Sequence, residues 1–209
     1  DHRKQHFPQK FWCMSHARPL LKSNFTFQDF AAHFSSFVNP FLHLFLTLSS
    51  PYSKLNDIGH SMAGFDGAIK NISIGIASAQ GKSWIHSGGT RTSGWGGSQD
   101  AFLESMAEAG KSVVDALDGN ILYINVMNRL SVDCDCDGNP AEPDMHDIGI
   151  LASTDPVALD QACIDLVYAA EDGTSLINRI ESRNGLHTLE HAAEIGLGSQ
   201  TYTLLGVDN

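Results

Sequence analysis

Residues 131–147 read SVDCDCDGNPAEPDMHD and contain five aspartates, a glutamate, two cysteines and a histidine. Carboxylates this close together repel one another, and a bound cation would relieve that repulsion. Carboxylate oxygens suit hard ions such as Ca²⁺, whereas thiolates and imidazole suit zinc or iron. The segment therefore predicts a divalent-metal site, and its two kinds of ligand predict different metals.

The carboxylates alone follow the spacing of a calcium loop. The pattern D-x-[DN]-x-[DN]-G is met by Asp133, Asp135, Asp137 and Gly138, and Asp144 falls at the twelfth position, where such a loop has its bidentate ligand. A strand is expected before the loop instead of a helix, so an EF-hand is not predicted.

The cysteines offer the second ligand set. Cys134 and Cys136 are two residues apart and would, in an extended chain, project together on the face opposite the aspartates. This pair, with His146 as a third ligand, suits zinc or iron. A polar turn without metal is the remaining alternative.

Four further side chains are candidates for catalysis. Lys70 in GAIKN and His86 in WIHSGG are expected at strand edges beside glycines, where a side chain can reach a ligand. Asp155 precedes Pro156 and reads as a helix N-cap, whereas Asp160 lies further along that helix and is predicted to face a cleft. Together they would serve an enzyme that acts on a small anionic substrate.

The elements that must position these residues are readable from residue 57 onward. Strands are predicted at 71–78, 82–87, 120–127, 147–153 and 200–207, and helices near 98–117, 154–170, 174–182 and 187–195. Strands that alternate with helices predict an α/β fold with a mostly parallel sheet and flanking helices. In such folds, functional groups collect at the loops that follow the strands.

Composition divides the chain near residue 56. Residues 1–56 carry six Lys/Arg, two Asp/Glu and nine of the eleven phenylalanines, whereas residues 57–209 carry seven Lys/Arg and twenty-two Asp/Glu. Residues 1–56 are predicted to be an aromatic-rich, irregular or partly helical extension, with one amphipathic helix over 25–38. Residues 57–209 are predicted to be the α/β domain.

Charge and cysteine content exclude several classes of partner. A net charge of −11 argues against nucleic acid and anionic membranes, and no run approaches the length of a membrane span. Four irregularly spaced cysteines do not make a disulfide framework, so a reducing, cytoplasmic setting is expected. The expected partners are a small molecule or a metal ion, and a homo-oligomer is a possible assembly.

Several motifs in order resemble a known family. The C-terminal part of the "uncharacterized Fe-S center protein" family, domain of unknown function 362, is similar to this chain over about residues 57–209; the matching stretches are 59–78, 81–89, 99–117, 121–170 and 180–199. The resemblance implies an α/β fold. Many relatives carry ferredoxin-type cysteine runs after the segment that matches His86, and this chain has none there.

The name of the family therefore does not imply an iron–sulfur cluster in this chain. A 4Fe-4S cluster takes four thiolates, commonly closely spaced. Here only Cys134 and Cys136 are neighbours, Cys13 lies in the extension, and Cys163 is expected on an apolar helix face. The sequence thus predicts a metal-binding α/β domain of unknown reaction, with a redox link as one reading and no 4Fe-4S cluster. A structural or interaction domain with a calcium-type loop and the enzyme described above are the alternatives.

Overall fold

The computed structural model describes residues 9–14, 43–47, 66–91, 93–134 and 139–207. The described residues form five strands and seven helical segments: β1 (Gln9–Met14), β2 (His43–Thr47), α3 (Ala68–Lys70), η1 (Asn71–Gly75), α4 (Ala79–His86), α5 (Gln99–Ala116), β3 (Ile121–Met127), β4 (Gly149–Ser153), α6 (Pro156–Ala169), α7 (Thr174–Ser182), α8 (His187–Glu194) and β5 (Tyr202–Gly206). The helix predicted over 25–38 lies outside the described residues.

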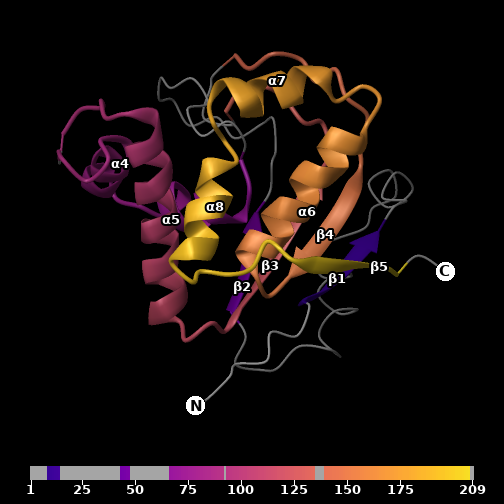
Figure 1. Cartoon of the computed structure of the whole chain (residues 1–209), viewed down its shortest axis with the longest axis horizontal. Coiled ribbons are helices and arrows are strands. Elements are labelled where there is room, and N and C mark those ends of the chain that lie inside the picture. The colour runs from indigo at the N-terminus through magenta and orange to yellow at the C-terminus, as the bar shows by residue number, and fades with distance from the viewer. Residues whose placement is uncertain (1–8, 15–42, 48–65, 92, 135–138, 208–209) are drawn as a thin grey trace.

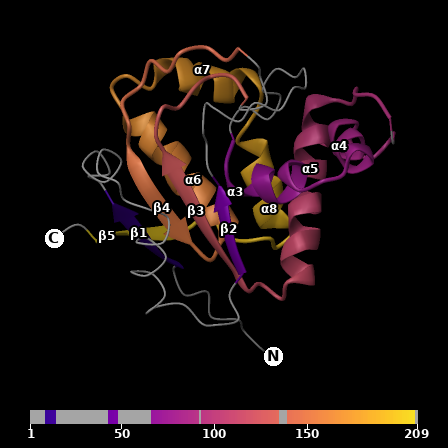
Figure 2. The same cartoon turned by 180° about the vertical axis from the view of Figure 1, so that it is seen from behind.

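The strands form one mixed sheet with the order β2-β3-β4-β1-β5. Helix α6 lies in front of the strands in Figure 1 and behind them in Figure 2, so it covers one face of the sheet, whereas α5 stands beside the sheet in both views. The fold is therefore mixed α/β. Two strands of the N-terminal part, β1 and β2, are hydrogen-bonded into the same sheet.

The predicted mostly parallel sheet was wrong. The pairs β2–β3 and β1–β5 are parallel, but β3–β4 and β1–β4 are antiparallel. A parallel connection needs a crossover segment, usually a helix. Between β3 and β4 the chain instead has the segment around residues 131–147, here called the acidic loop, whose described residues contain no helix.

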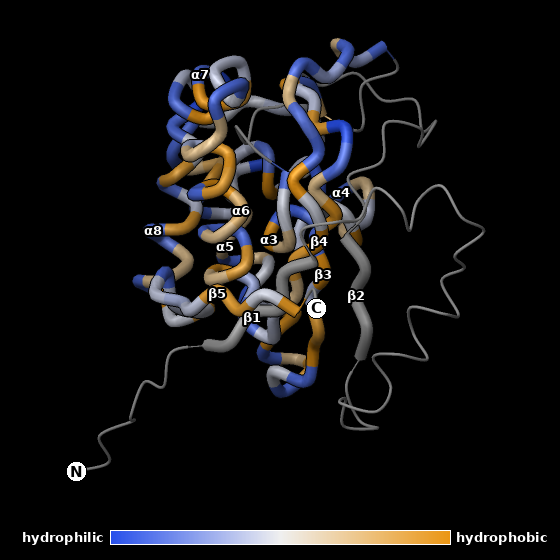
Figure 3. The backbone as a smooth tube through the Cα atoms, turned by 90° about the vertical axis from the view of Figure 1, so that its right-hand side faces the viewer, coloured by the Kyte–Doolittle hydropathy of each residue, from blue (hydrophilic) through white to orange (hydrophobic). Residues whose placement is uncertain are grey.

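The core lies between the sheet and α6. β3 is almost wholly apolar and buried, as predicted for 120–127, and Ile121, Tyr123 and Leu151 pack with Ala158 and Leu159 of α6. Figure 3, in which the backbone is coloured by residue hydropathy, accordingly shows much of β3 and α6 in the hydrophobic colour. A second cluster joins α5, α6 and α8, and a third joins η1, α4 and α5.

The strands predicted at 71–78 and 82–87 were wrong, since both segments are helical. Ile72, Ile74 and Ile76 alternate as in a strand, but Ile76 is 53% exposed while Ile69 and Ile72 are fully buried. The buried pair faces α5, where both side chains lie next to Gly110. Packing against a neighbouring helix thus overrides the local pattern.

The later elements agree with the sequence. Helix α5 ends before Asp118 and Gly119, which both adopt positive φ, and α6 begins with Asp155 as N-cap and Pro156 in its first turn. Among the helices that the structure describes, none combines the length and apolarity needed to cross a lipid bilayer.

Candidate functional site

The acidic loop is closed at its base. The side chain of Asp147 accepts hydrogen bonds from Asn128 Nδ2 at 2.7 Å and from the backbone amide of Arg129 at 2.8 Å. Arg129 adopts a positive φ of 50°, which turns the chain out of β3. The loop therefore leaves the sheet and returns to it through one small polar cluster.

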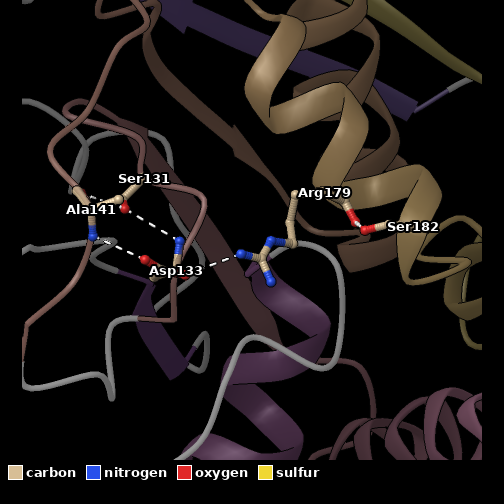
Figure 4. Close-up of polar contacts among 5 residues, drawn as sticks. All are labelled: Ser131, Asp133, Ala141, Arg179 and Ser182. Carbon is tan, nitrogen blue, oxygen red and sulfur yellow. Dashed lines mark hydrogen bonds and ion pairs between the residues drawn. The ribbon is translucent and has the colours of Figure 1, made fainter.

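Asp133 ties the outgoing arm of the loop to its returning arm and to α7. Its carboxylate accepts from Arg179 Nη2 at 3.1 Å and from the Ala141 amide at 2.9 Å, while Ser131 donates to the Ala141 carbonyl at 2.8 Å (Figure 4). Side chains Asp133 and Arg179 are each about one-fifth exposed, at 20% and 21%. Asp133 is thus occupied by protein donors.

Cys134 has a different environment. Its side chain is buried, and its Sγ accepts a hydrogen bond from Lys70 Nζ at 3.1 Å. Lys70, at the end of α3, also pairs with Asp66 at 2.6 Å, and the other oxygen of Asp66 is buried without a hydrogen-bond partner. An ammonium beside a sulfur favours the thiolate over the thiol.

The returning arm is bound to the segment before α7 and to its first turn. Ser175 Oγ donates to Asp144 at 2.6 Å. His146 binds Asp172 twice, through its backbone amide at 2.8 Å and through Nδ1 at 2.7 Å. These two hydrogen bonds, from the amide first and then from the ring, lower the pKa of Asp172.

The predicted metal ligands are therefore spread over separate partners. Asp133 contacts α7 and Asp144 contacts its first turn. Cys134 contacts α3, and His146 contacts the connection between α6 and α7. Within the described residues, no three His, Cys, Asp or Glu side chains converge as metal ligands would. Asp135, Cys136 and Asp137 lie outside those residues, so the metal site stays a prediction.

Asp155 and Asp160 are held by backbone amides. Asp155 caps α6 at Val157 and Ala158, as predicted, and also accepts from the Ser199 amide at 2.9 Å. Burial raises the pKa of Asp155, against the opposing effect of these amides.

Asp160 faces no cleft, contrary to expectation. It is 1% exposed and accepts from the amides of Ala68 and Ile69 at 2.7 and 3.0 Å and from Asn125 Nδ2 at 2.9 Å. It therefore caps the helical segment that begins at Ala68, and Gly67 leaves room for its carboxylate. Burial raises the pKa of Asp160 to about 6.

Lys70 and His86 lie on helices instead of strand edges. His86 ends α4, and its ring is stacked between Trp95 and Phe102 with centroid distances of 4.3 and 5.0 Å. Burial lowers the pKa of His86, and the charges of Lys70 and Lys82 lower it further, against the hydrogen bond to the Lys82 carbonyl. The structure does not pair His86 with Asp155 or Asp160 by any described contact.

Sequence reasoning missed the partners of these residues. Asp133 contacts Arg179, His146 contacts Asp172, and Cys134 contacts Lys70. The residues of these pairs are 46, 26 and 64 positions apart in the sequence, so no local pattern indicates them. One missed pairing had a usable signal: His187 and His191 on α8 share the four-residue spacing of Glu104 and Glu108 on α5. These side chains face each other at 3.0 and 3.6 Å.

Comparisons with known proteins place the chain in a family. No curated protein and no solved structure gave a significant match. The profile of DUF362, described as a domain of unknown function, matches residues 58–165, just over half of the 209 residues, and this range includes every candidate from Lys70 to Asp160. This confirms the resemblance found in the sequence, and the chain belongs to the DUF362 family.

Proposed function

We propose that this DUF362 domain binds a divalent metal ion, zinc or iron, through the thiolates of Cys134 and Cys136. The observation that carries the proposal is the separation of the two kinds of ligand at the start of the acidic loop. Asp133 is occupied by Arg179 and by the Ala141 amide, whereas Cys134 lies beside Lys70. A hard cation at Asp133 would have to compete with these donors, so the proposal rests on the thiolates.

The surroundings of Cys134 favour a ligand-competent sulfur. Metals bind the thiolate, and protons compete with them for it. Lys70 supplies the positive charge that favours this form, and Asp66 at 2.6 Å holds the ammonium in place. Asp66 also gives Lys70 a partner when a cation approaches the sulfur.

His146 is suited to be a third ligand. Its Nδ1 lies 2.7 Å from Asp172, and a carboxylate can only accept, so Nδ1 is the donor and Nε2 is the nitrogen that a metal would bind. A histidine that donates to a carboxylate with one nitrogen and binds metal with the other is a common metal-site arrangement. Zinc at such a site would be structural or a Lewis acid, and iron would add redox chemistry.

The calcium alternative has less support. Asp133 and Asp144 occupy the first and twelfth positions of the calcium pattern, and the two are bound to Arg179 and Ser175, respectively. A calcium ion would have to displace both contacts. A 4Fe-4S cluster is not part of the proposal, because it takes four thiolates and the loop has two cysteines, while Cys163 of α6 accepts from Asn125 of β3 at 3.4 Å.

The test is metal binding by the purified chain under anaerobic conditions, with zinc, cobalt as a spectroscopic substitute, and calcium. Replacing Cys134 and Cys136 together with Ser should abolish zinc binding and the thiolate-to-cobalt absorption. Cys163→Ser is the matched control and should leave both unchanged. Affinity should fall as the pH is lowered, because protons compete for sulfur.

The opposite ranking would overturn the proposal. If Asp133→Asn with Asp137→Asn removed binding more than the cysteine variant did, and calcium outcompeted zinc, the carboxylates would be the ligands. Stoichiometric iron and sulfide after reconstitution would instead indicate a cluster.

A further inference from the structure

A second site is suggested by a lobe with unusual charge, made of α4 and the loop residues 87–91 and 93–97. Helix α4 lies at the edge of the molecule beside α5 (Figures 1 and 2). The chain carries a net charge of −11, yet residues 79–97 contain no Asp or Glu and include Lys82 and Arg91. The lobe is therefore the part of an acidic protein that an anion can approach without meeting carboxylates on the same segment.

The ring of His86 is held in one tautomer. Its Nδ1 lies 2.7 Å from the carbonyl oxygen of Lys82, one turn earlier in α4. A carbonyl can only accept, so Nδ1 carries the proton and Nε2 carries the lone pair. His86 is 8% exposed, and its Nε2 has no hydrogen-bond partner among the described residues. This nitrogen is not completely buried.

The glycine-rich loop closes on itself and puts Trp95 over this ring. Ser87 Oγ accepts from the Arg91 amide at 2.9 Å, and Thr90 donates to the Ser87 carbonyl at 2.8 Å. Gly97 returns so close to Ser87 that a Cβ would lie 2.8 Å from its carbonyl oxygen. The two ends of the loop, at Ser87 and Gly97, therefore lie together.

Trp95 and Arg91 belong to the same glycine-rich loop, and both are exposed. Trp95 stacks on His86 with one face and is 43% exposed, so its other face is open to solvent. An Nη1 atom of Arg91 lies 3.5 Å from the position of a Cβ on Gly96, the residue after Trp95. The Arg91 guanidinium thus lies next to the residue that follows an exposed indole, and such a pair of groups can bind an oxyanion while the indole stacks on a ring.

We propose that this lobe binds a small anion composed of a planar ring with a carboxylate or phosphate group. The ring stacks on the open face of Trp95, and Arg91 binds the oxyanion. His86 takes up a proton when the ligand binds, because the negative charge of the ligand offsets the positive charges of Lys70 and Lys82, which disfavour the protonated ring. The group of α5 that packs against His86 is the uncharged ring of Phe102. This site is separate from the metal site and does not depend on it.

Trp95 itself reports the binding. In the full chain with Trp12→Phe and Trp84→Phe, Trp95 is the remaining tryptophan. Benzoate and adenosine monophosphate, titrated separately, should quench its emission with saturation. Benzoate should bind more tightly at pH 6 than at pH 8, by up to about tenfold per pH unit where binding takes up one proton. Benzoate is the ligand for this test, because a phosphate monoester itself titrates at about pH 6. The ligand that binds more tightly shows whether the lobe prefers an aromatic carboxylate or a nucleotide.

Two variants test the roles of the side chains. Arg91→Gln should weaken binding about tenfold, which corresponds to one charge-assisted hydrogen bond, whereas Arg129→Gln, an exposed arginine of the acidic loop, should have no effect. His86→Gln should remove the pH dependence of binding. Absence of saturation with both ligands, or equal affinity in Arg91→Gln, would overturn the proposal.

Discussion

Two groups of carboxylates in this chain differ in what holds them. Asp155 and Asp160 of α6 are buried and accept mainly from backbone amides at helix N-termini. The more exposed carboxylates Asp144 and Glu104 accept from side chains of neighbouring helices instead, and Asp133 accepts from the Arg179 side chain as well as from the Ala141 amide. The comparison shows that candidate catalytic residues in sequence can be structural, since amides of a folded backbone are rigid donors that leave no group free for a substrate.

The same difference affects protonation. Burial raises the pKa of Asp160 to about 6 in spite of its three donors, because desolvation disfavours the charged form. In the exposed pair, His146 lowers the pKa of Asp172. The buried group thus resists ionisation, and the exposed group is stabilised in its ionised form.

The largest effect is expected for Asp160→Asn. An asparagine has one acceptor oxygen, so its NH₂ group would face an amide of Ala68 or Ile69 and leave a buried donor unsatisfied. We expect a loss of about 3 kcal/mol in the free energy of unfolding, measured by urea denaturation. The control Asp144→Asn, whose partner is Ser175 at the surface, should lose less than about 0.5 kcal/mol. Equal losses would remove the distinction between the two groups.

A smaller effect is expected for the ion pair between the acidic loop and α7. Arg179→Met should reduce the free energy of unfolding by about 1 kcal/mol, because the pair is partly buried and charge-assisted. Arg129→Met removes a pair with the 90% exposed Glu142 and should change stability by less than about 0.5 kcal/mol. In a double-mutant cycle, Asp133→Asn and Arg179→Met should be non-additive, and additive losses would show that the contact contributes nothing.

The smallest effect is a pH dependence at the α5–α8 interface. The hydrogen bond to Glu104 raises the pKa of His187 from its ordinary 6.5, with Asp100 and Glu190 adding to the effect against partial burial. The stabilisation from this pair is therefore complete below pH 6.5 and is lost as the pH rises through the raised pKa.

This loss can be measured by comparing the free energies of unfolding of the wild type and His187→Gln between pH 5.5 and 8.5. The difference should decrease by about 0.5 kcal/mol as the pH rises. In a Glu104→Gln background the decrease should become smaller, because only Asp100 and Glu190 then raise the pKa of His187. A difference that grows with pH would contradict the assignment.

The sequence by itself determined the elements whose signals are local. The apolar run at 120–127 predicted β3, Asp155 with Pro156 predicted the start of α6, and Asp118-Gly119 predicted the end of α5. Caps, turns and hydrophobic periods act over a few residues, so they can be read without knowledge of the fold. The DUF362 resemblance was likewise legible, since its motifs occur in order along the chain.

Only the tertiary structure decided how those elements meet. It made residues 71–86 largely helical because α5 covers them, it paired β3 with β4 antiparallel across the acidic loop, and it placed Lys70 beside Cys134 from 64 positions away. It also turned Asp160 toward the amides of α3. These contacts are selected by packing between distant segments, and the free energy of such packing depends on the whole fold instead of on neighbouring residues.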